Sequence, residues 1–201
     1  MNLGSVALPD PAAMLAAAIG ERAAAQRIGI VRAIARGEII FEQGLPLDRA
    51  FILHAGLVKL VYATASGEEW IKSLIADRGV FGPSGQDRSA PMAYSAMAIE
   101  RSTLLALPLD WLAGEIAASR ELTGMHARFI DWVRLRKEAR EQALLCRSAE
   151  ERYRDLLAKD PALIARLPQS DIARFLRITP VAFSRIKRRM RTGEAIRPTP
   201  A

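Results

Sequence analysis

The chain contains one cysteine, Cys146, and two histidines, His54 and His126, among its 201 residues. A single cysteine excludes both an internal disulfide and an iron–sulfur cluster held by four thiolates. The histidines fall in different segments, so they cannot supply the two-histidine, one-carboxylate set of a cupin-like oxygenase. We therefore predict no catalytic residues and no metal site, ordinary histidines that do not ligate haem, and a helix-packing role for Cys146 in place of a redox switch.

Long apolar runs are absent as well. No stretch reaches the roughly 18 apolar residues of a transmembrane helix. The alanine-rich residues 11–19 lack the basic residues that precede the apolar part of a secretion signal. No long basic amphipathic segment indicates an anchor on a membrane surface. We expect a cytoplasmic protein without a membrane partner.

Acidic residues do not balance the basic ones in the second half of the chain. Residues 1–110 hold 10 Lys and Arg against 11 Asp and Glu, a net charge of −1. Residues 111–201 hold 19 against 11, a net charge of +8. This uneven charge indicates a polyanionic partner that binds the second half with salt-sensitive affinity.

Residues 167–190 predict two short helices joined by a tight turn. Thr179 is a good N-cap for the second helix, and Pro180 fits its first position. The inward residues of the two helices are Ile172, Ala173 and Leu176 in the first and Phe183, Ile186 and Met190 in the second. From Arg174 to Arg191 there are seven Lys and Arg and no acidic residue. These features predict a helix-turn-helix that places its second helix in the DNA major groove.

The outward face of the second helix would meet the duplex. We predict that it contacts bases through Val181, Ser184 and Arg185, with Arg185 as the candidate for a bidentate bond to guanine. The predicted phosphate contacts are Thr179, Lys187, Arg188, Arg189 and Arg191. The alternative is an amphipathic helix whose basic face is only solvated.

The remaining segments predict a fold of the α+β class. Residues 37–107 read as many short strands separated by turns, which favours an antiparallel barrel or a jelly roll. We place a sensor domain at residues 1–118, a dimerisation helix at 119–147 and a DNA-binding domain at 148–201.

Residues 121–147 predict one long helix of about 40 Å. Its apolar residues recur at spacings of three and four, with one charged interruption at Arg136, as in the seam between two helices. The predicted homodimer seam consists of Leu122, Met125, Phe129, Trp132, Arg136, Ala139 and Ala143. The alternative is a helix that packs only against its own domain.

This order of parts resembles the Crp/Fnr family of bacterial transcription regulators. The matching fragments are RGEIIFEQG (36–44), FILHAGLVKLVY (51–62), SGEE (66–69), DRGVFG (77–82), LLALP (104–108) and PQSDIARFLRITPVAFSRI (168–186). The resemblance implies a cyclic-nucleotide-binding-like β-barrel, a dimerisation helix and a winged helix-turn-helix. It also implies homodimers on inverted-repeat operators in double-stranded DNA, and contact with RNA polymerase through residues that cannot be assigned here.

The chain departs from the nucleotide-binding members of that family. They place Glu after the Phe-Gly turn, whereas Pro83 follows Phe81 and Gly82 here. They place Arg eleven residues after that Phe, where this chain has Met92; Arg88 lies nearby but at the wrong spacing. A cyclic phosphate needs a cation or a nest of amides, so we predict a regulator that does not respond to cAMP. No cofactor is predicted, the effector is unknown, and its candidate pocket comprises Phe81, Gly82, Pro83, Arg88, Met92, Tyr94 and Ser95.

The predicted helix-turn-helix, which we call the reading unit, also departs from the family pattern. Pro180 and Val181 replace a common Arg-Glu, and Arg177 occupies a turn position where Gly is common. If that position needs a positive φ, arginine there costs about 1 kcal/mol. The alternative function is a sensory or scaffold module that acts through protein contacts without specific DNA binding.

Overall fold

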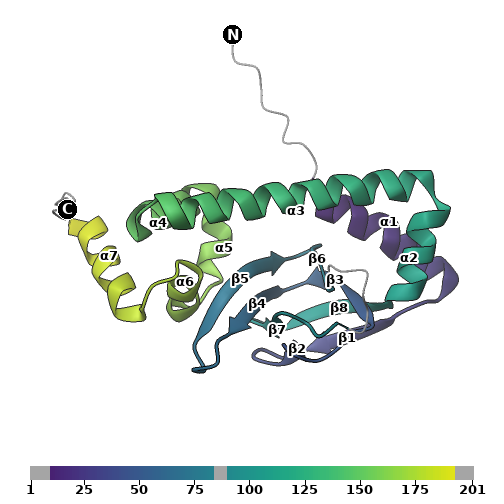
Figure 1. The fold of residues 1–201 in the computed structure, drawn as a ribbon, viewed down its shortest axis with the longest axis horizontal. Helices are drawn as coiled ribbons and strands as arrows, with labels where there is room; N and C mark the ends of the chain where they lie inside the picture. Colours follow the sequence, from purple (N-terminus) through teal and green to yellow (C-terminus); the bar gives the residue numbers. More distant parts are fainter. Residues whose placement is uncertain (1–9, 84–89, 193–201) are drawn as a thin grey trace, which may run out of the picture.

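Two antiparallel sheets form the centre of the molecule in the computed structural model, which describes residues 10–83 and 90–192 (Figure 1). One sheet has the order β1-β8-β3-β6 and the other the order β2-β7-β4-β5. The first contains β1 (Ile30–Ile34), β8 (Ser102–Pro108), β3 (Arg49–Ala55) and β6 (Val80–Phe81). The second contains β2 (Ile39–Phe41), β7 (Ser95–Ala98), β4 (Leu57–Ala63) and β5 (Glu69–Ala76).

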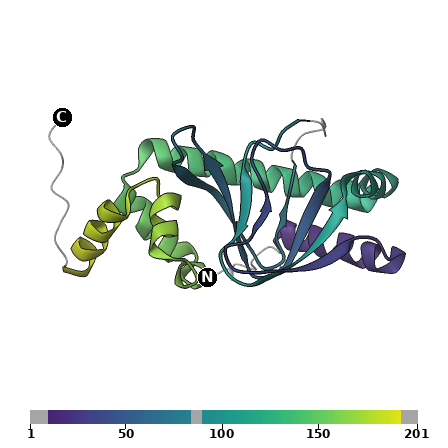
Figure 2. The same ribbon diagram turned by 90° about the horizontal axis from the view of Figure 1, so that it is seen from below.

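This strand order is that of a double-sheet jelly roll. Of the two β architectures expected from the sequence, the described strands therefore form the two-sheet one and no closed barrel. The space between the sheets is filled by apolar side chains that include Phe41, Phe51, Phe81 and Leu104. β1, β6, β2 and β5 are the sheet edges, and β5 is the edge that faces the C-terminal helices (Figure 2).

Seven helices are present in the described residues. They are α1 (Pro11–Gln26), α2 (Leu109–Ala118), α3 (Arg120–Cys146), α4 (Ala149–Lys159), α5 (Pro161–Ala165), α6 (Gln169–Phe175) and α7 (Pro180–Thr192). Local signals set several of their ends: the Ser119 hydroxyl caps α3, and Ser148 and Glu151 form a capping box at the start of α4. The long helix expected over residues 121–147 is thus confirmed as α3.

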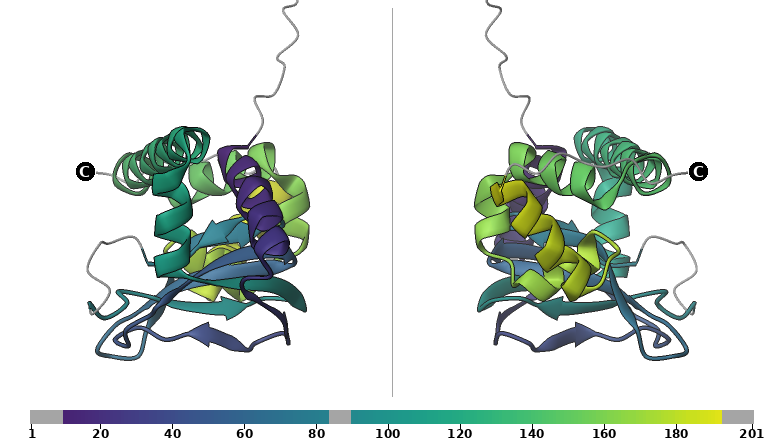
Figure 3. Two further views of the ribbon diagram at one scale, coloured as in Figure 1. Left: turned by 90° about the vertical axis from the view of Figure 1, so that its right-hand side faces the viewer. Right: turned by 90° about the vertical axis from the view of Figure 1, so that its left-hand side faces the viewer.

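α3 runs over the sheets along most of the molecule (Figure 1), and α1 packs beside its first half on the same side of the sheets (Figures 1 and 3). Leu15, Ile19 and Ala23 of α1 form one core with Ile52 and Leu122. The alanine-rich segment is therefore a structural helix that closes the outer face of the first sheet. In the part of the chain that the structure describes, no helix has both the length and the hydropathy needed to cross a membrane.

Candidate nucleic-acid interface

α6 and α7 form the helix pair expected from the sequence, joined by a turn through residues 176–179. The Thr179 hydroxyl accepts a hydrogen bond from the Ala182 amide at 3.2 Å, so Thr179 is the N-cap of α7 and Pro180 its first residue. Arg177 has a φ of 62°, and the following amide, of Ile178, donates to the Ala173 carbonyl at 3.0 Å. The turn thus needs a left-handed residue at 177, as expected for a position where glycine is common.

The inner face of α7 is held by an aromatic contact. Phe183 is 1% exposed, and its ring meets that of Tyr153 on α4 edge to face, with 4.9 Å between centroids. Ile186 is buried beside it, together with Ile172, Ala173 and Leu176 of the preceding segment. Because this core fixes one side of α7, the opposite side is presented outward.

The outward side carries the predicted base-contacting residues. Val181 is 62% exposed, and Ser184 and Arg185 are exposed as well. The Ser184 hydroxyl donates to the Pro180 carbonyl at 3.0 Å, which leaves its oxygen able to accept. A groove of about 500 Å³ follows this surface, lined by Tyr153, Leu157, Gln169, Ser184, Lys187, Arg188, Met190 and Arg191.

The predicted phosphate-contacting residues have different environments. Lys187, Arg188 and Arg191 are exposed, and within residues 10–83 and 90–192 none of them forms an ion pair. Arg189 instead pairs with Glu150 at 3.0 Å, and this buried carboxylate also holds Arg154 at 2.7 Å. Arg189 therefore ties α7 to α4, a role that the sequence did not reveal.

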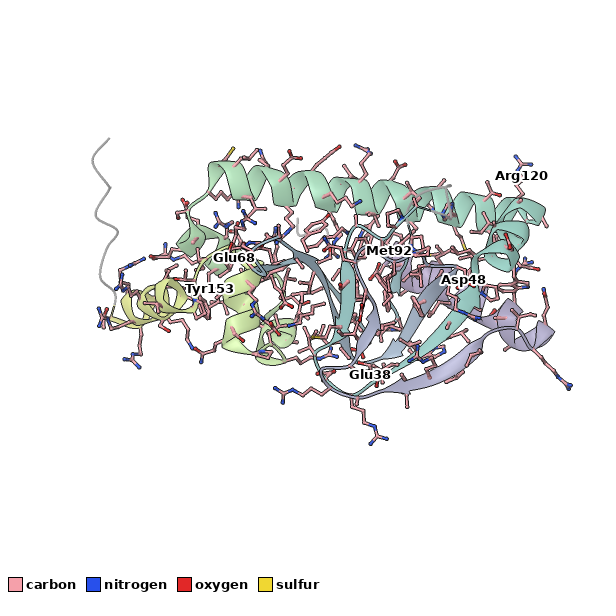
Figure 4. The ribbon with its side chains drawn as sticks, turned by 60° about the horizontal axis from the view of Figure 1, so that its bottom comes forward. Glu38, Asp48, Glu68, Met92, Arg120 and Tyr153 are labelled. Atoms are coloured by element: carbon pink, nitrogen blue, oxygen red, sulfur yellow. The ribbon has the colours of Figure 1, made fainter. Side chains whose placement is uncertain are left out.

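The predicted effector residues lie between the sheets and near the end of β6. Phe81, Met92 and Tyr94 are buried, and Met92 is labelled in Figure 4. The Tyr94 hydroxyl donates to the Gly82 carbonyl at 2.6 Å, and burial raises the pKa of this phenol to about 12. Four aromatic rings, those of Phe41, Phe51, Phe81 and Tyr94, stack or meet edge to face there.

The other residues of this region add few groups that could bind an anion. Pro83 is half-buried, and the Ser95 hydroxyl oxygen accepts a hydrogen bond from the Gln43 backbone amide at 2.9 Å. Gly82 has a φ of 148°, and a side chain there would approach the Ala50 backbone. Arg88 lies outside the described residues. Met92 packs in the core and supplies no positive charge.

Lys72 is a cation that the sequence did not single out. It lies on β5, with its amine 4.5 Å from the centre of the Tyr94 ring. Burial, reinforced by the charges of Lys137 and Arg140, lowers the pKa of Lys72 to about 8. Nothing in its sequence neighbourhood indicates this, because both cationic neighbours come from α3.

The predicted seam residues on α3 divide into two groups. Leu122 is 1% exposed, and Met125 and Phe129 pack beside it against α1 and the first sheet. Leu122 is thus a core residue of its own chain, which corrects its assignment to a surface between chains. The remaining members lie further along α3: Trp132 and Ala143 are half-buried, and Arg136 and Ala139 are exposed.

Two further α3 residues extend this surface. Leu135 is 56% exposed, and Cys146, which was expected to pack between helices, is exposed in the single chain. The Arg136 guanidinium covers the Trp132 ring at 4.5 Å. We call Trp132, Leu135, Ala139, Ala143 and Cys146 the outer stripe of α3.

Comparisons with known proteins are informative at the level of domain and fold. Residues 31–119 match the family model of the cyclic nucleotide-binding domain. FixK2 from Bradyrhizobium japonicum is 19% identical, with a TM-score of 0.68 over 87% of this chain and 90% of its own. CLP from Xanthomonas campestris, a c-di-GMP-responsive regulator, is 13% identical, with a TM-score of 0.71 over 90% of this chain and 96% of its own.

A third structure carries the family name. It is a protein from Eubacterium rectale described as a transcriptional regulator of the crp/fnr family, 12% identical, with a TM-score of 0.64 over 87% of this chain and 83% of its own. Residues 31–119 thus resemble a cyclic nucleotide-binding domain, and the chain shares the fold of these three structures. No curated protein matches it in sequence.

One implied part of the Crp/Fnr fold is missing from the described residues. The resemblance implied a winged helix-turn-helix, but of the residues described after β8 none forms a strand. The short helix α5 connects α4 to α6 instead, capped by the Asp160 carboxylate. Residues 193–201, which follow α7, lie outside the described residues, so the wing stays a prediction from the resemblance.

Proposed function

We propose that the protein is a dimeric, sequence-specific DNA-binding regulator of transcription. One observation carries the proposal: α7 presents an exposed face with Val181, Ser184 and Arg185 at its start, followed by Lys187, Arg188 and Arg191, which form no ion pair within the described residues. A helix whose basic face is only solvated would share the cap and the buried inner stripe, so the support comes from the run of cations on the outer face.

The outward residues of α7 have the chemistry of a reading helix. Arg185 can bond O6 and N7 of guanine with its planar fork, and Val181 can contact the methyl group of thymine. Lys187, Arg188 and Arg191, with the Thr179 hydroxyl, would meet phosphates, which position the protein without reading sequence. Arg189 is a weaker candidate because Glu150 already neutralises it.

We also propose that two chains associate along the outer stripe of α3. Leu122, Met125 and Phe129 are used within the chain, so a partner helix would meet the outer stripe; the exposed Ile130 and Leu145 lie outside that stripe. The boundaries 1–118, 119–147 and 148–201 then separate sensor, dimer helix and DNA-binding unit. A twofold dimer of this kind would bind inverted repeats, with half-sites one helical turn apart.

The sensor is proposed not to respond to cAMP. Pro83 and Met92 stand where a ribose-binding carboxylate and a phosphate-binding arginine are expected, and Met92 is buried among apolar side chains. The described cation beside this region, Lys72 on β5, contacts the Tyr94 ring and does not stand at the position of the family's phosphate-binding arginine. The effector remains unassigned, and contact with RNA polymerase stays a prediction from the resemblance.

Titration of labelled genomic DNA fragments with the purified protein tests this function. Fluorescence anisotropy at about 50 and 200 mM salt should show affinity that falls steeply with salt, because bound phosphates release counterions. Some fragments should bind far more tightly than others at the higher salt concentration. No binding at either concentration by folded protein would contradict the proposal and favour a module that acts through protein contacts.

A further inference from the structure

The first helix of the reading unit, α6, is docked on the edge strand of the second sheet (Figures 1 and 2). At the centre of the contact, the Lys59 amine on β4 donates to the Asp171 carboxylate on α6 at 2.9 Å. Their side chains are only 9% and 7% exposed. A buried ion pair loses much of its Coulombic gain to desolvation, but it demands one geometry. It therefore fixes where α6 sits on the sheet.

Arg140 of α3 joins three elements at the end of this contact. One of its terminal nitrogens donates to the Ile71 carbonyl of β5 at 2.8 Å and to the Phe175 carbonyl of α6 at 2.9 Å. Its guanidinium also lies 3.9 Å from the centre of the Phe175 ring. Phe175 is the last residue of α6, so its carbonyl has no partner within that helix. A single planar group thus satisfies the end of α6 and holds it to both the sheet and the long helix.

Further contacts at the edges of this interface hold the reading unit in the same orientation. Arg166 donates to the Gly56 carbonyl at 2.8 Å and pairs with Glu100 at 2.6 Å. Arg177, in the turn before α7, lies 4.5 Å from the centre of the Trp70 ring on β5. Arg177, the left-handed residue of the turn, is therefore in contact with the second sheet.

We propose that Arg140 is a positioning residue that sets the orientation of α7 relative to α3 and the second sheet. A shift of α3 along β5 must either break the Arg140 bridge or move α6 with it, and α7 follows α6 because they share one core. The docked orientation leaves the outward face of α7 uncovered, so docking does not block DNA binding, and the proposal is that this orientation is the one that binds. This inference rests on the proposed DNA-binding function.

The predicted consequence of losing the bridge is entropic. A reading unit that is free to rotate must recover its orientation when it binds, which reduces the apparent affinity by the fraction of time spent in other orientations. The phosphate contacts themselves would not change. The affinity for DNA should therefore fall while its salt dependence stays the same. Loss of a phosphate-binding residue would instead reduce the salt dependence as well.

The test compares Arg140→Lys with Arg22→Lys in the full chain. Lysine keeps the charge of Arg140 but has no planar group to stack on the Phe175 ring, and its ammonium, on a shorter side chain, is not held between the two carbonyls by that stacking. Arg22 is a matched control because it also bridges two partners, Glu115 and Ser119, far from the reading unit. Hydrogen exchange at residues 71–72 and 175–178 reports docking, and titration of a DNA fragment that the wild-type protein binds reports affinity at two salt concentrations.

Arg140→Lys should speed exchange in both segments and weaken DNA binding about tenfold with an unchanged salt slope; Arg22→Lys should do neither. Phe175→Leu, which removes only the stacked ring, should show a smaller change of the same kind if Arg140→Lys does not fold.

Unchanged exchange in a folded variant would overturn the proposal, as would faster exchange with unchanged or tighter DNA binding. If the wild-type protein binds no DNA, the proposed function fails, while exchange still decides whether Arg140 holds the docked unit.

Discussion

Single side chains on α7 have distinct environments despite similar sequence contexts. Arg185 and Arg188 are exposed and unpaired within the described residues, whereas Arg189 is held by the buried Glu150 carboxylate. An arginine fork that is free to rotate can seek a base edge or a phosphate, but one already paired loses that bond if it turns outward. The three arginines should therefore differ in function.

Arg185→Ala and Arg188→Ala should weaken DNA binding in different ways. Loss of a bidentate base contact at Arg185 should cost about 1–3 kcal/mol on the preferred site and relax preference at one base pair. Loss of Arg188 should weaken all sequences alike and reduce the salt slope by about one. Anisotropy titrations on a preferred and a scrambled fragment at several salt concentrations measure both. Identical behaviour of the two variants would contradict this assignment of roles.

Lys72→Met should stabilise the protein at neutral pH. Burial lowers the pKa of Lys72 from 10.5 to about 8, so its charged form destabilises the folded state. That penalty is present in full below pH 8 and is lost as the pH rises from about 8 to 10.5. Because Lys72 is only partly buried, we expect a gain of about 1 kcal/mol at pH 7.

Urea unfolding at pH 7 and pH 9.5 measures the Lys72 effect. The advantage of Lys72→Met over the wild-type protein should shrink at the higher pH. An advantage that is constant across this range would show that the gain comes from packing and not from charge.

At the scale of elements, features that depend on neighbouring residues, such as helix caps and buried stripes, were predicted well. Thr179 and Pro180 start α7 as expected, and Phe183 and Ile186 form its buried stripe. Contacts between distant elements were not predictable: Arg140 and Lys59 have no local feature that indicates their partners on α6. Their geometry is set only when the sheet and the helices pack together.

The α3 helix shows the limit of periodicity. Its apolar spacing correctly predicted a long helix, but a pattern does not say what the apolar face packs against. Leu122 faces α1, which arose from an alanine-rich segment with no assigned role. The strand pattern likewise left a barrel and a jelly roll open, because strand order depends on pairing between distant residues.

The Lys59–Asp171 pair should tolerate replacement of both residues better than replacement of one. Asp171→Ala leaves the buried Lys59 amine without its partner and should lower the free energy of unfolding by about 3–5 kcal/mol. Lys59→Met combined with Asp171→Leu removes both charges and should cost much less. Urea unfolding of the three proteins measures this, and an equal loss in the single and double variants would refute the account of the pair.

At the scale of the whole molecule, the account requires two copies. One chain presents one reading helix, and the outer stripe of α3 is the surface proposed to join a second. Leu135→Glu should place a charge in that stripe and shift the protein from dimer to monomer in sedimentation experiments. Ile130→Glu alters a comparably exposed residue on another side of α3 and should leave the dimer intact. Equal effects of the two substitutions would place the interface elsewhere.

Selection of DNA from a random-sequence pool tests the central claim most directly, namely that the exposed face of α7 reads a duplex. The wild-type protein should enrich inverted repeats whose half-sites lie about one helical turn apart, and Arg185→Ala should lose one position of that sequence. Failure of folded wild-type protein to enrich any sequence would contradict the claim.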